Sequence, residues 1–195
     1  MNDQTLQFEY MALDDFEEML ADKPDNERWE LIGGRVVRMM VGARLEHNYL
    51  VQNIAFALRE RLRAGGSLCR TTTETFRLKA TQQASSLLPD VMVHCNPFDG
   101  GSTSISNPVV LVEIVSPGSE GRDRVEKWNI YKKLPSLQHY LIVSRNAPLV
   151  DIYDRVGIAW PDVRRIEGLG GIVTLPALGL SVPMAEIYRD VIAAG

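Results

Sequence analysis

Residues 88–127 contain the feature that most restricts how this chain can fold. Two apolar runs rich in β-branched residues lie in this stretch, and each carries a carboxylate, Asp90 in the first and Glu113 in the second. Lys127 follows in a segment with helical periodicity. A carboxylate inside a hydrophobic strand costs free energy unless a neighbouring group neutralises it. The three residues therefore predict a shared divalent-metal site.

The chemistry of Mg²⁺ and Mn²⁺ suits this arrangement. Both ions prefer oxygen ligands and keep several waters, so one or two carboxylates from rigid strands are enough to hold them. Asp90 opens its strand directly after Pro89, and Glu113 is the only polar residue of residues 109–115. If these strands pair, the two carboxylates converge on one metal ion that can activate water and polarise a phosphoryl oxygen. Lys127 could then orient the water or stabilise charge on the phosphate.

The composition is that of an ordinary globular protein. The chain has 195 residues, of which 45% are apolar and 24% charged, and its net charge is −4. It contains no internal repeat or linker, so we expect a single domain over residues 1–195. An acidic protein is a poor candidate for a permanently clamped, nonspecific DNA binder, although a local basic groove remains possible.

Compartment and cysteine state are also expectations from the sequence. The N-terminus has no signal-peptide pattern, and no apolar run approaches the roughly 18 residues of a membrane span, so we expect a soluble, cytoplasmic protein. Cys69 and Cys95 lie in separate strand-like runs. Two buried free thiols are the expected state in a reducing cytoplasm, and a disulfide is the alternative.

The remaining pattern predicts helices on a mixed sheet. Helical spacing of apolar residues indicates four helices, over residues 11–21, 45–64, 120–134 and 184–192. Extended segments are expected at 28–40 (a hairpin turning at Gly33-Gly34), 67–78, 90–95, 109–115, 137–143 and 149–153, with a further strand pair within 160–173. Residues 81–86 should form a polar turn and 96–108 a loop long enough to act as a flap. The fold class is α/β (α+β): a mixed sheet core flanked by helices, with a small N-terminal helix and hairpin.

Simpler explanations exist for the individual candidates. Asp90 could be a strand-entry residue, and Lys127 could be a solvated partner of Asp123, four residues earlier on a helix surface. His47 lies one turn before Val51 at the start of a helix and could merely cap it or pack there. Glu113 is the hardest of the candidates to explain structurally, because a single acid in an apolar strand needs a partner.

Several segments match one known family in order and spacing. They are Trp29–Val36, Glu46–Asn48, Leu88–Val93, Val112–Pro117, Asp123–Lys127, Tyr131, Gln138–Val143 and Leu178–Tyr188. Together they resemble the Uma-type restriction endonuclease family of the PD-(D/E)XK nuclease superfamily, from about residue 11 onward. Two positions depart from the pattern. Val115 stands where the superfamily usually has its lysine, and Ser144-Arg145 replaces an Asp-Pro pair.

The resemblance implies a restriction-endonuclease-like fold and a metal-dependent phosphodiesterase site. Asp90 and Glu113 would be metal ligands, and Lys127 would be the catalytic lysine in the helical position that the family uses. His47 and Glu30 would lie near the site as further members. The resemblance also implies a homodimer, because many nucleases of this architecture cut two strands with two copies.

The leading functional hypothesis is therefore a Mg²⁺- or Mn²⁺-dependent endonuclease that hydrolyses phosphodiester bonds in DNA. A catalytically silent protein of the same fold, which binds nucleic acid or a protein partner, is the alternative. A phosphoesterase that acts on small substrates is a third possibility.

Overall fold

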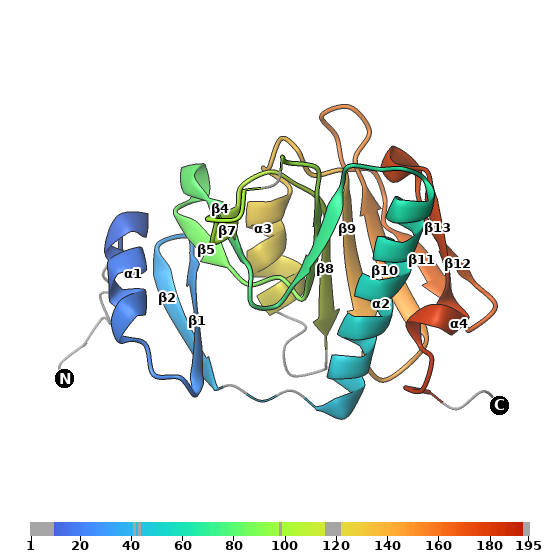
Figure 1. The fold of residues 1–195 in the computed structure, drawn as a ribbon, viewed down its shortest axis with the longest axis horizontal. Coiled ribbons are helices and arrows are strands. Elements are labelled where there is room, and N and C mark those ends of the chain that lie inside the picture. Colours follow the sequence, from blue (N-terminus) through green and yellow to red (C-terminus); the bar gives the residue numbers. More distant parts are fainter. Residues whose placement is uncertain (1–9, 41, 43, 98, 116–121, 193–195) are drawn as a thin grey trace, which may run out of the picture.

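Two β-sheets form the body of the protein, which we describe from a computed structural model (Figure 1). The structure describes residues 10–40, 42, 44–97, 99–115 and 122–192, without the side chains of residues 40 and 122–124. The first sheet has the strand order β2-β1-β5-β4-β7, and the second has the order β11-β10-β9-β8-β6-β3. A separate pair, β12-β13, stands beside the second sheet.

The elements follow one another as the chain runs. The strands are β1 Glu27–Ile32, β2 Arg35–Met40, β3 Arg70–Thr73, β4 Arg77–Ala80, β5 Ser85–Leu87, β6 Val91–His94, β7 Ser104–Ile105, β8 Pro108–Val115, β9 His139–Ser144, β10 Leu149–Asp154, β11 Arg164–Glu167, β12 Ile172–Leu175 and β13 Leu180–Pro183. The α-helices are α1 Leu13–Met19, α2 Leu45–Ala64, α3 Trp128–Tyr131 and α4 Met184–Ile187. Single 3-10 turns cover Leu20–Asp22, Thr81–Gln83 and Pro176–Leu178, and a π-helical segment covers Arg122–Lys127.

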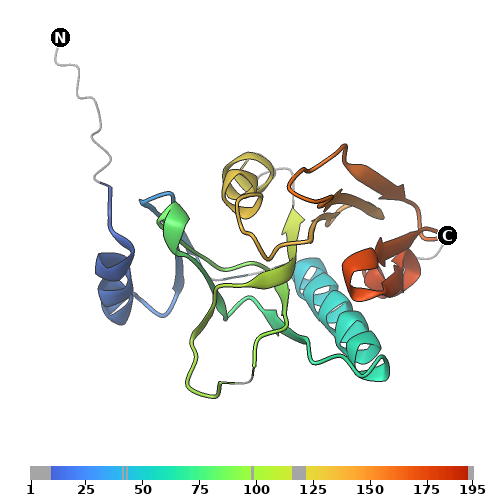
Figure 2. The ribbon, with the colours of Figure 1, turned by 90° about the horizontal axis from the view of Figure 1, so that it is seen from above.

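The six-stranded sheet has a helix on each face, as expected for a strand that is buried on both sides. Along β8, the alternating residues Val110 and Val112 pack with α2, whereas Leu111 packs on the other face with Tyr131 of α3. Figure 2 shows α2 and α3 on opposite sides of β8. α2 also contacts α4 and β13. None of the described helices is long and apolar enough to cross a membrane.

The N-terminal helix and hairpin lie at the opposite end of the molecule from α4 (Figure 1). β1 and β2 pair from Glu27↔Met40 to Ile32↔Arg35, so Gly33 and Gly34 form the predicted turn. Both glycines have positive φ, +56° and +82°, which suits this turn and disfavours a side chain. The mixed α/β class and the hairpin are confirmed, and a helix lies within each of the four expected segments. Two of these helices are shorter than expected: within 120–134 a π-helical segment precedes α3, with residues 120 and 121 outside the described part, and within 184–192 α4 ends at Ile187.

The prediction of one strand over residues 67–78 is wrong. The chain leaves the six-stranded sheet after β3 and enters the other sheet at β4, with a turn at residues 74–76 between them. The predicted turn over 81–86 is also partly a strand, because β5 joins β4 to β1. Threonine-rich segments favour extended structure in general, but the local pattern does not say which sheet each half joins.

Two connections also differ from the expectation. The loop over 96–108 contains β7, which pairs in parallel with β4 and buries Ile105, so this segment is tied to a sheet. Within 160–173, β11 and β12 do not pair with each other. β11 pairs with β10, and β12 pairs with β13. Pairing partners are set by tertiary packing, which the spacing of turn residues does not reveal.

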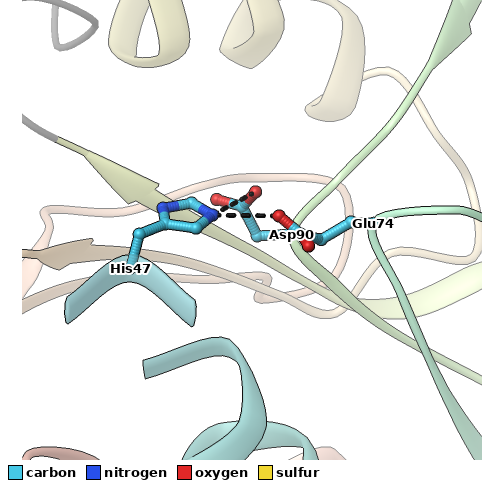
Figure 3. A group of neighbouring side chains, drawn as sticks. All are labelled: His47, Glu74 and Asp90. Carbon is cyan, nitrogen blue, oxygen red and sulfur yellow. Dashed lines mark hydrogen bonds and ion pairs between the residues drawn. The ribbon is translucent and has the colours of Figure 1, made fainter. Parts of the chain in front are cut away.

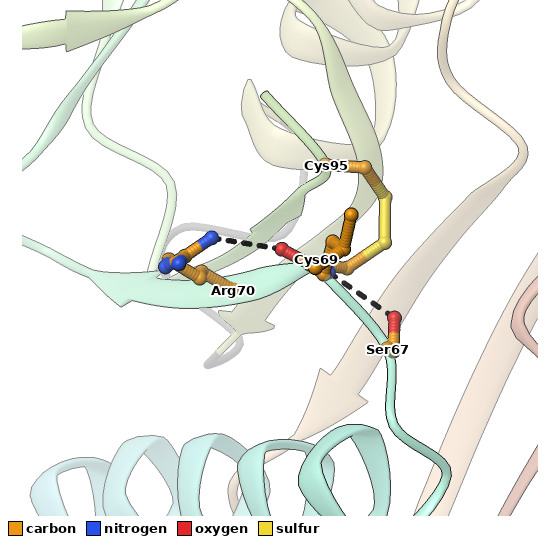
Figure 4. Close-up of a disulfide and its surroundings, with 5 residues drawn as sticks. Ser67, Cys69, Arg70 and Cys95 are labelled. Carbon is orange, nitrogen blue, oxygen red and sulfur yellow. Dashed lines mark hydrogen bonds between the residues drawn. A yellow bond between two sulfur atoms is a disulfide. The ribbon is translucent and has the colours of Figure 1, made fainter. Parts of the chain in front are cut away.

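Cys69 and Cys95 form a disulfide, so the expectation of buried free thiols is wrong (Figure 4). Cys95 is exposed and Cys69 is half-buried. The first residue pair of the antiparallel strands β3 and β6 is Arg70↔His94, so the two cysteines face each other one position beyond that pair. The disulfide therefore closes one end of the β3–β6 pair.

Replacing both cysteines by serine should lower thermal stability. The bond spans 26 residues, and closing a loop of this size restricts the unfolded chain by about 3 kcal/mol in the chain-entropy model. Calorimetry with and without reductant checks this, because reductant should lower the Tm of the parent protein and leave that of Cys69→Ser/Cys95→Ser unchanged. Two cysteines that react with an alkylating reagent before any reduction would contradict the disulfide.

The cytoplasmic location expected from the sequence stays a prediction.

Candidate active site

The pairing of β6 with β8 brings the two predicted acids to neighbouring strands. The strands are antiparallel, with Val91 opposite Val112, so Asp90 and Glu113 lie one position further along the same end of this pair. Asp90 directly precedes β6, and its Oδ2 accepts a hydrogen bond from the backbone N–H of Ile114 at 2.6 Å. Asp90 and Glu113 are both buried, with 7% and 3% of their surface exposed.

Glu113 is neutralised by a lysine and hydrogen-bonded to a tyrosine. Lys127 Nζ lies 3.1 Å from Glu113 Oε1 and 3.2 Å from Oε2, so it donates to both oxygens. The hydroxyl of Tyr131 donates to Oε1 at 2.6 Å. Burial, followed by the nearby charge of Glu113, raises the pKa of Tyr131 well above its usual value. Tyr131 therefore stays protonated and remains a donor.

Lys127 is buried, so the alternative in which it is a solvated surface residue is wrong. Only 4% of its surface is exposed. It ends the π-helical segment Arg122–Lys127, and α3 begins at the next residue. The wider turn of a π-helix changes the direction in which successive side chains point, and such segments recur at functional sites. The side chain of Asp123 lies outside the described part of the structure.

Glu30 reaches the same lysine from the other sheet. Glu30 lies in β1, and its Oε1 is 3.2 Å from Lys127 Nζ and accepts a hydrogen bond from the backbone N–H of Leu88 at 2.7 Å. Its other oxygen, Oε2, is buried and has no hydrogen-bond partner among the residues that the structure describes. The ammonium of Lys127 is therefore held between Glu30 and Glu113, one from each sheet.

A second cluster joins His47, Glu74 and Asp90 (Figure 3). His47 lies in the first turn of α2, and its Nε2 is 3.0 Å from Glu74 Oε1 and 3.4 Å from Asp90 Oδ1. Glu74 stands in the turn between β3 and β4, and its backbone N–H donates to the carbonyl of Asp90 at 3.2 Å. Arg28 Nη1 lies 3.3 Å from the same Glu74 oxygen. One potential ligand atom from each of His47, Glu74 and Asp90 lies within 4.8 Å of the other two.

The two carboxylates change the protonation of His47. Burial alone would lower its pKa, but the hydrogen bonds and negative charges of Asp90 and Glu74 outweigh burial and raise the pKa to about 9. In turn, the hydrogen bond from His47 lowers the pKa of Glu74. At neutral pH the cluster therefore consists of an imidazolium between two carboxylates.

We expect His47 to titrate near pH 9 in the presence of a chelator. Because the folded-state pKa lies above the usual 6.5, the stability that His47 contributes is present in full below about pH 6.5 and is lost as the pH rises through about 9. NMR of the imidazole signals gives the pKa, and thermal melts from pH 6 to 10 give the stability. Burial lowers the pKa values of both other histidines, His94 and His139, so the His47 signal should stand apart. A histidine spectrum with every midpoint at or below 6.5 would contradict the cluster.

Asp90 links the two clusters, and their side chains together could hold a divalent cation. Asp90 Oδ1 contacts His47. Asp90 Oδ2 accepts the backbone N–H of Ile114, the residue after Glu113 in β8. Imidazole and carboxylate ligands together suit Mn²⁺ better than Mg²⁺, whereas carboxylates alone suit both. The buried, unpartnered Oε2 of Glu30 is a further oxygen close to this region. The donor set therefore supports a divalent-metal site around Asp90.

The structure thus places every predicted site residue in one of two clusters. Asp90 and His47 contact each other, and Glu30, Glu113 and Lys127 form the other group. Glu74 and Tyr131 were missed. Glu74 has a sequence signal of the kind that identified Glu113, because it is a lone acid within a threonine-rich run that favours strands. Tyr131 has only the general signal that a buried tyrosine hydroxyl needs a partner.

Comparisons with solved structures support the fold. A crystal structure of an Anabaena variabilis protein, described as "a putative nuclease belonging to DUF820", superposes with a TM-score of 0.74. The match covers 93% of this chain and 99% of that one, at 15% sequence identity. At this identity the similarity concerns the fold alone.

Comparisons of sequence identify relatives and a family. Two Synechocystis sp. proteins, "Uncharacterized protein slr1290" and "Uncharacterized protein sll1609", are 27% and 28% identical to this chain. The first match covers 86% of this chain and 87% of the relative, and the second covers 72% and 80%. Residues 13–185 match the protein-family model Uma2, described as "Putative restriction endonuclease". The chain therefore belongs to the Uma2 family, as the resemblance of its sequence motifs indicated.

Proposed function

We propose that this protein is a Mg²⁺- or Mn²⁺-dependent endonuclease that hydrolyses phosphodiester bonds in DNA. The observation that carries the proposal is the buried contact of Lys127 with Glu113. Glu113 lies in β8, which pairs with β6, and Asp90 directly precedes β6. A cationic donor beside two carboxylates that could hold a metal ion is a combination that suits phosphoryl transfer. Membership of the family supports the same class of reaction.

Asp90 and Glu113 are the proposed metal ligands. Their carboxylates come from two paired strands, which give rigid positions. A divalent ion held there supplies Lewis-acid polarisation of a phosphoryl oxygen and makes a nearby water more acidic. His47 and Glu74 extend the ligand set on the other side of Asp90, where their atoms are close enough to share a cation.

Lys127 is the proposed catalytic lysine. Its ammonium is positioned by Glu30 on one side and Glu113 on the other, so its place does not depend on Glu113 alone. From there it can donate to a phosphate oxygen on which negative charge develops. Tyr131 donates to Glu113 and restricts the orientation of that carboxylate, which makes it a positioning residue.

A homodimer is part of the proposal, because two copies related by a twofold axis can place one active site on each strand of a duplex. Light scattering during size-exclusion chromatography tests this directly. One chain has a mass of 21.8 kDa, so a species of twice that mass is expected. A species with the mass of one chain across the concentrations used for activity would contradict the dimer.

The activity is tested with plasmid and single-stranded DNA, Mn²⁺ or Mg²⁺, and two proteins, the parent and Glu113→Ala. Cleavage by the parent and its loss in the variant are expected. The proposal is wrong if cleavage persists in folded Glu113→Ala, or if no nucleic acid is cut with either metal.

Calorimetric titration with Mn²⁺ separates an enzyme from a silent protein of the same fold. We expect heat of binding in the parent that is lost in Asp90→Asn/Glu113→Gln. A protein without such binding, which still associates with DNA in a salt-sensitive manner, would be a nucleic-acid-binding member of the family that does not cut.

A further inference from the structure

A cavity of about 480 Å³ lies beside the His47–Glu74–Asp90 cluster, between β1, β4 and the turn that carries Glu74. Glu74 lines this cavity and contacts His47, so the cavity and the cluster share a wall. Its volume is in the range of sites that hold a small ligand or part of a larger one. The proposed function assigns no role to this cavity.

Three cations line the cavity, and the hydrogen bonds of two of them go only to neutral oxygens, although Arg77 also lies over the Phe16 ring at 5.5 Å from its centroid. Arg77, in β4, donates to the carbonyl of Trp29 at 3.0 Å and to the hydroxyl of Ser86 at 3.3 Å. Lys23 donates to the carbonyls of Pro24 at 2.8 Å and Glu27 at 2.7 Å. Within the described ranges neither side chain forms an ion pair. The third cation, Arg28, is paired with Glu74.

Three carboxylates also line the cavity, so the formal charges of its lining balance, and Glu74 is the one that is ion-paired among the described residues. Glu74 accepts from His47 and Arg28. Glu27 accepts a hydrogen bond from the indole N–H of Trp29. Asp25 is exposed at the rim, so water screens its charge. Arg77 and Lys23 are therefore the two lining cations that no described carboxylate pairs with, whereas Arg28 is paired with Glu74.

The environment of Arg77 favours an anionic ligand. Arg77 is half-buried, and this burial is the main cause that lowers its pKa. The charges of Glu30 and Glu17, which form no ion pair with it, act in the opposite direction, and Arg28 adds a smaller lowering. A guanidinium that is partly removed from water and bonded only to neutral oxygens gains from a charged acceptor, and its fork geometry suits phosphate.

We propose that this cavity binds a phosphodiester of nucleic acid, on the same strand as the bond that is cut, through Arg77 and Lys23. The assignment to the strand that is cut rests on the proposed function. Glu74 forms the wall between the cavity and the metal ligands, so a strand that places one phosphate at Asp90 can place a neighbouring phosphate in the cavity. Arg77 and Lys23 would then position the strand without reading its sequence, as phosphate contacts do.

The experiment measures binding, separately from cleavage. A fluorescein-labelled single-stranded oligonucleotide is titrated with protein in a chelator at several salt concentrations, and fluorescence anisotropy gives the affinity. Arg77→Gln and Lys23→Gln should each weaken binding about five- to tenfold and reduce the salt slope by about 0.7, the value for one lost phosphate contact on a single strand. Lys79→Gln is the matched control. Lys79 lies two residues from Arg77 in β4, but it is paired with Glu17 and does not line the cavity.

The control should bind within twofold of the parent and keep its salt slope. Because Arg77 also bonds to the backbone of β1, Arg77→Gln is first checked by thermal melting, and Arg77→Lys and Lys23→Gln decide the question if it does not fold. Parent-like affinity and slope in the folded variants would overturn the proposal. So would complete displacement of the oligonucleotide by an equal concentration of inorganic phosphate, which would identify a site for the free anion.

The outcomes distinguish this proposal from the proposed function. A protein that binds DNA through Arg77 and Lys23 but never cleaves it would contradict the proposed endonuclease activity and support phosphodiester binding in the cavity. If the parent, Arg77→Gln and Lys23→Gln all cleave DNA with the same KM, the endonuclease activity is supported and phosphodiester binding in the cavity is contradicted.

Discussion

Replacing Lys127 by methionine is expected to cause the largest combined loss of stability and activity. The substitution leaves Glu30 and Glu113 buried without the cation that they share. Removing one partner from a buried ion pair costs roughly 3–5 kcal/mol, because the remaining charge is uncompensated. Cleavage should fall by about 10²–10³, the cost of losing one donor that stabilises developing charge. Thermal or denaturant unfolding and single-turnover cleavage measure the two effects.

Two further variants separate the structural and catalytic roles of Lys127. Lys127→Met/Glu113→Gln removes both members of one pair, so it should recover part of the lost stability while cleavage stays at least as slow as in Lys127→Met. Lys133→Met is the surface control, since Lys133 is exposed and lies in the same segment of the chain. If Lys127→Met were as stable and as active as the Lys133 control, the buried ion pair would have no role in either property.

Asp90→Asn is expected to slow cleavage strongly with little change in the fold. Asparagine has nearly the same shape as aspartate and can still accept the hydrogen bond from Ile114, but it removes the charge beside His47. Loss of a carboxylate that holds the metal should slow cleavage about 10³-fold, equivalent to several kcal/mol of transition-state stabilisation. The same variant should weaken Mn²⁺ binding and lower the pKa of His47, since the charge of Asp90 helps to raise it.

The structure offers a matched control for this variant. Asp154 Oδ1 lies 2.7 Å from His139 Nδ1, so Asp154→Asn changes a second aspartate–histidine pair outside the site. We expect this control to retain both cleavage and the parent pKa of His47. Parent-like Mn²⁺ affinity and cleavage in Asp90→Asn would exclude Asp90 as a metal ligand.

The candidate site was predictable in part, for a specific reason. Glu113 stands alone in an apolar strand, and a buried acid requires a partner wherever that strand folds. Asp90 follows from its position at the start of the neighbouring strand, and the two strands do pair. Glu74 was not found, because residues 67–78 read locally as one strand and the break at 74–76 depends on which sheet each half joins.

The sequence by itself determined the elements that depend on the local spacing of residue types within a short segment. α2 is an example, since its apolar stripe runs from Leu50 to Leu62 and its bounds agree with the expected helix. The hairpin at Gly33-Gly34 is another, because positive φ at both positions favours glycine. Those features depend on local geometry, which residue spacing encodes directly.

Only the tertiary structure decided which distant side chains meet. Lys127 could have faced solvent, and it is the packing of its segment against β8 and β1 that buries it between Glu113 and Glu30. His47 meets Glu74 because β3 ends where α2 begins its first turn, and the disulfide between Cys69 and Cys95 depends on the register of β3 and β6. These contacts join residues far apart in the chain, so their free energies depend on strand partners and burial that no local pattern specifies.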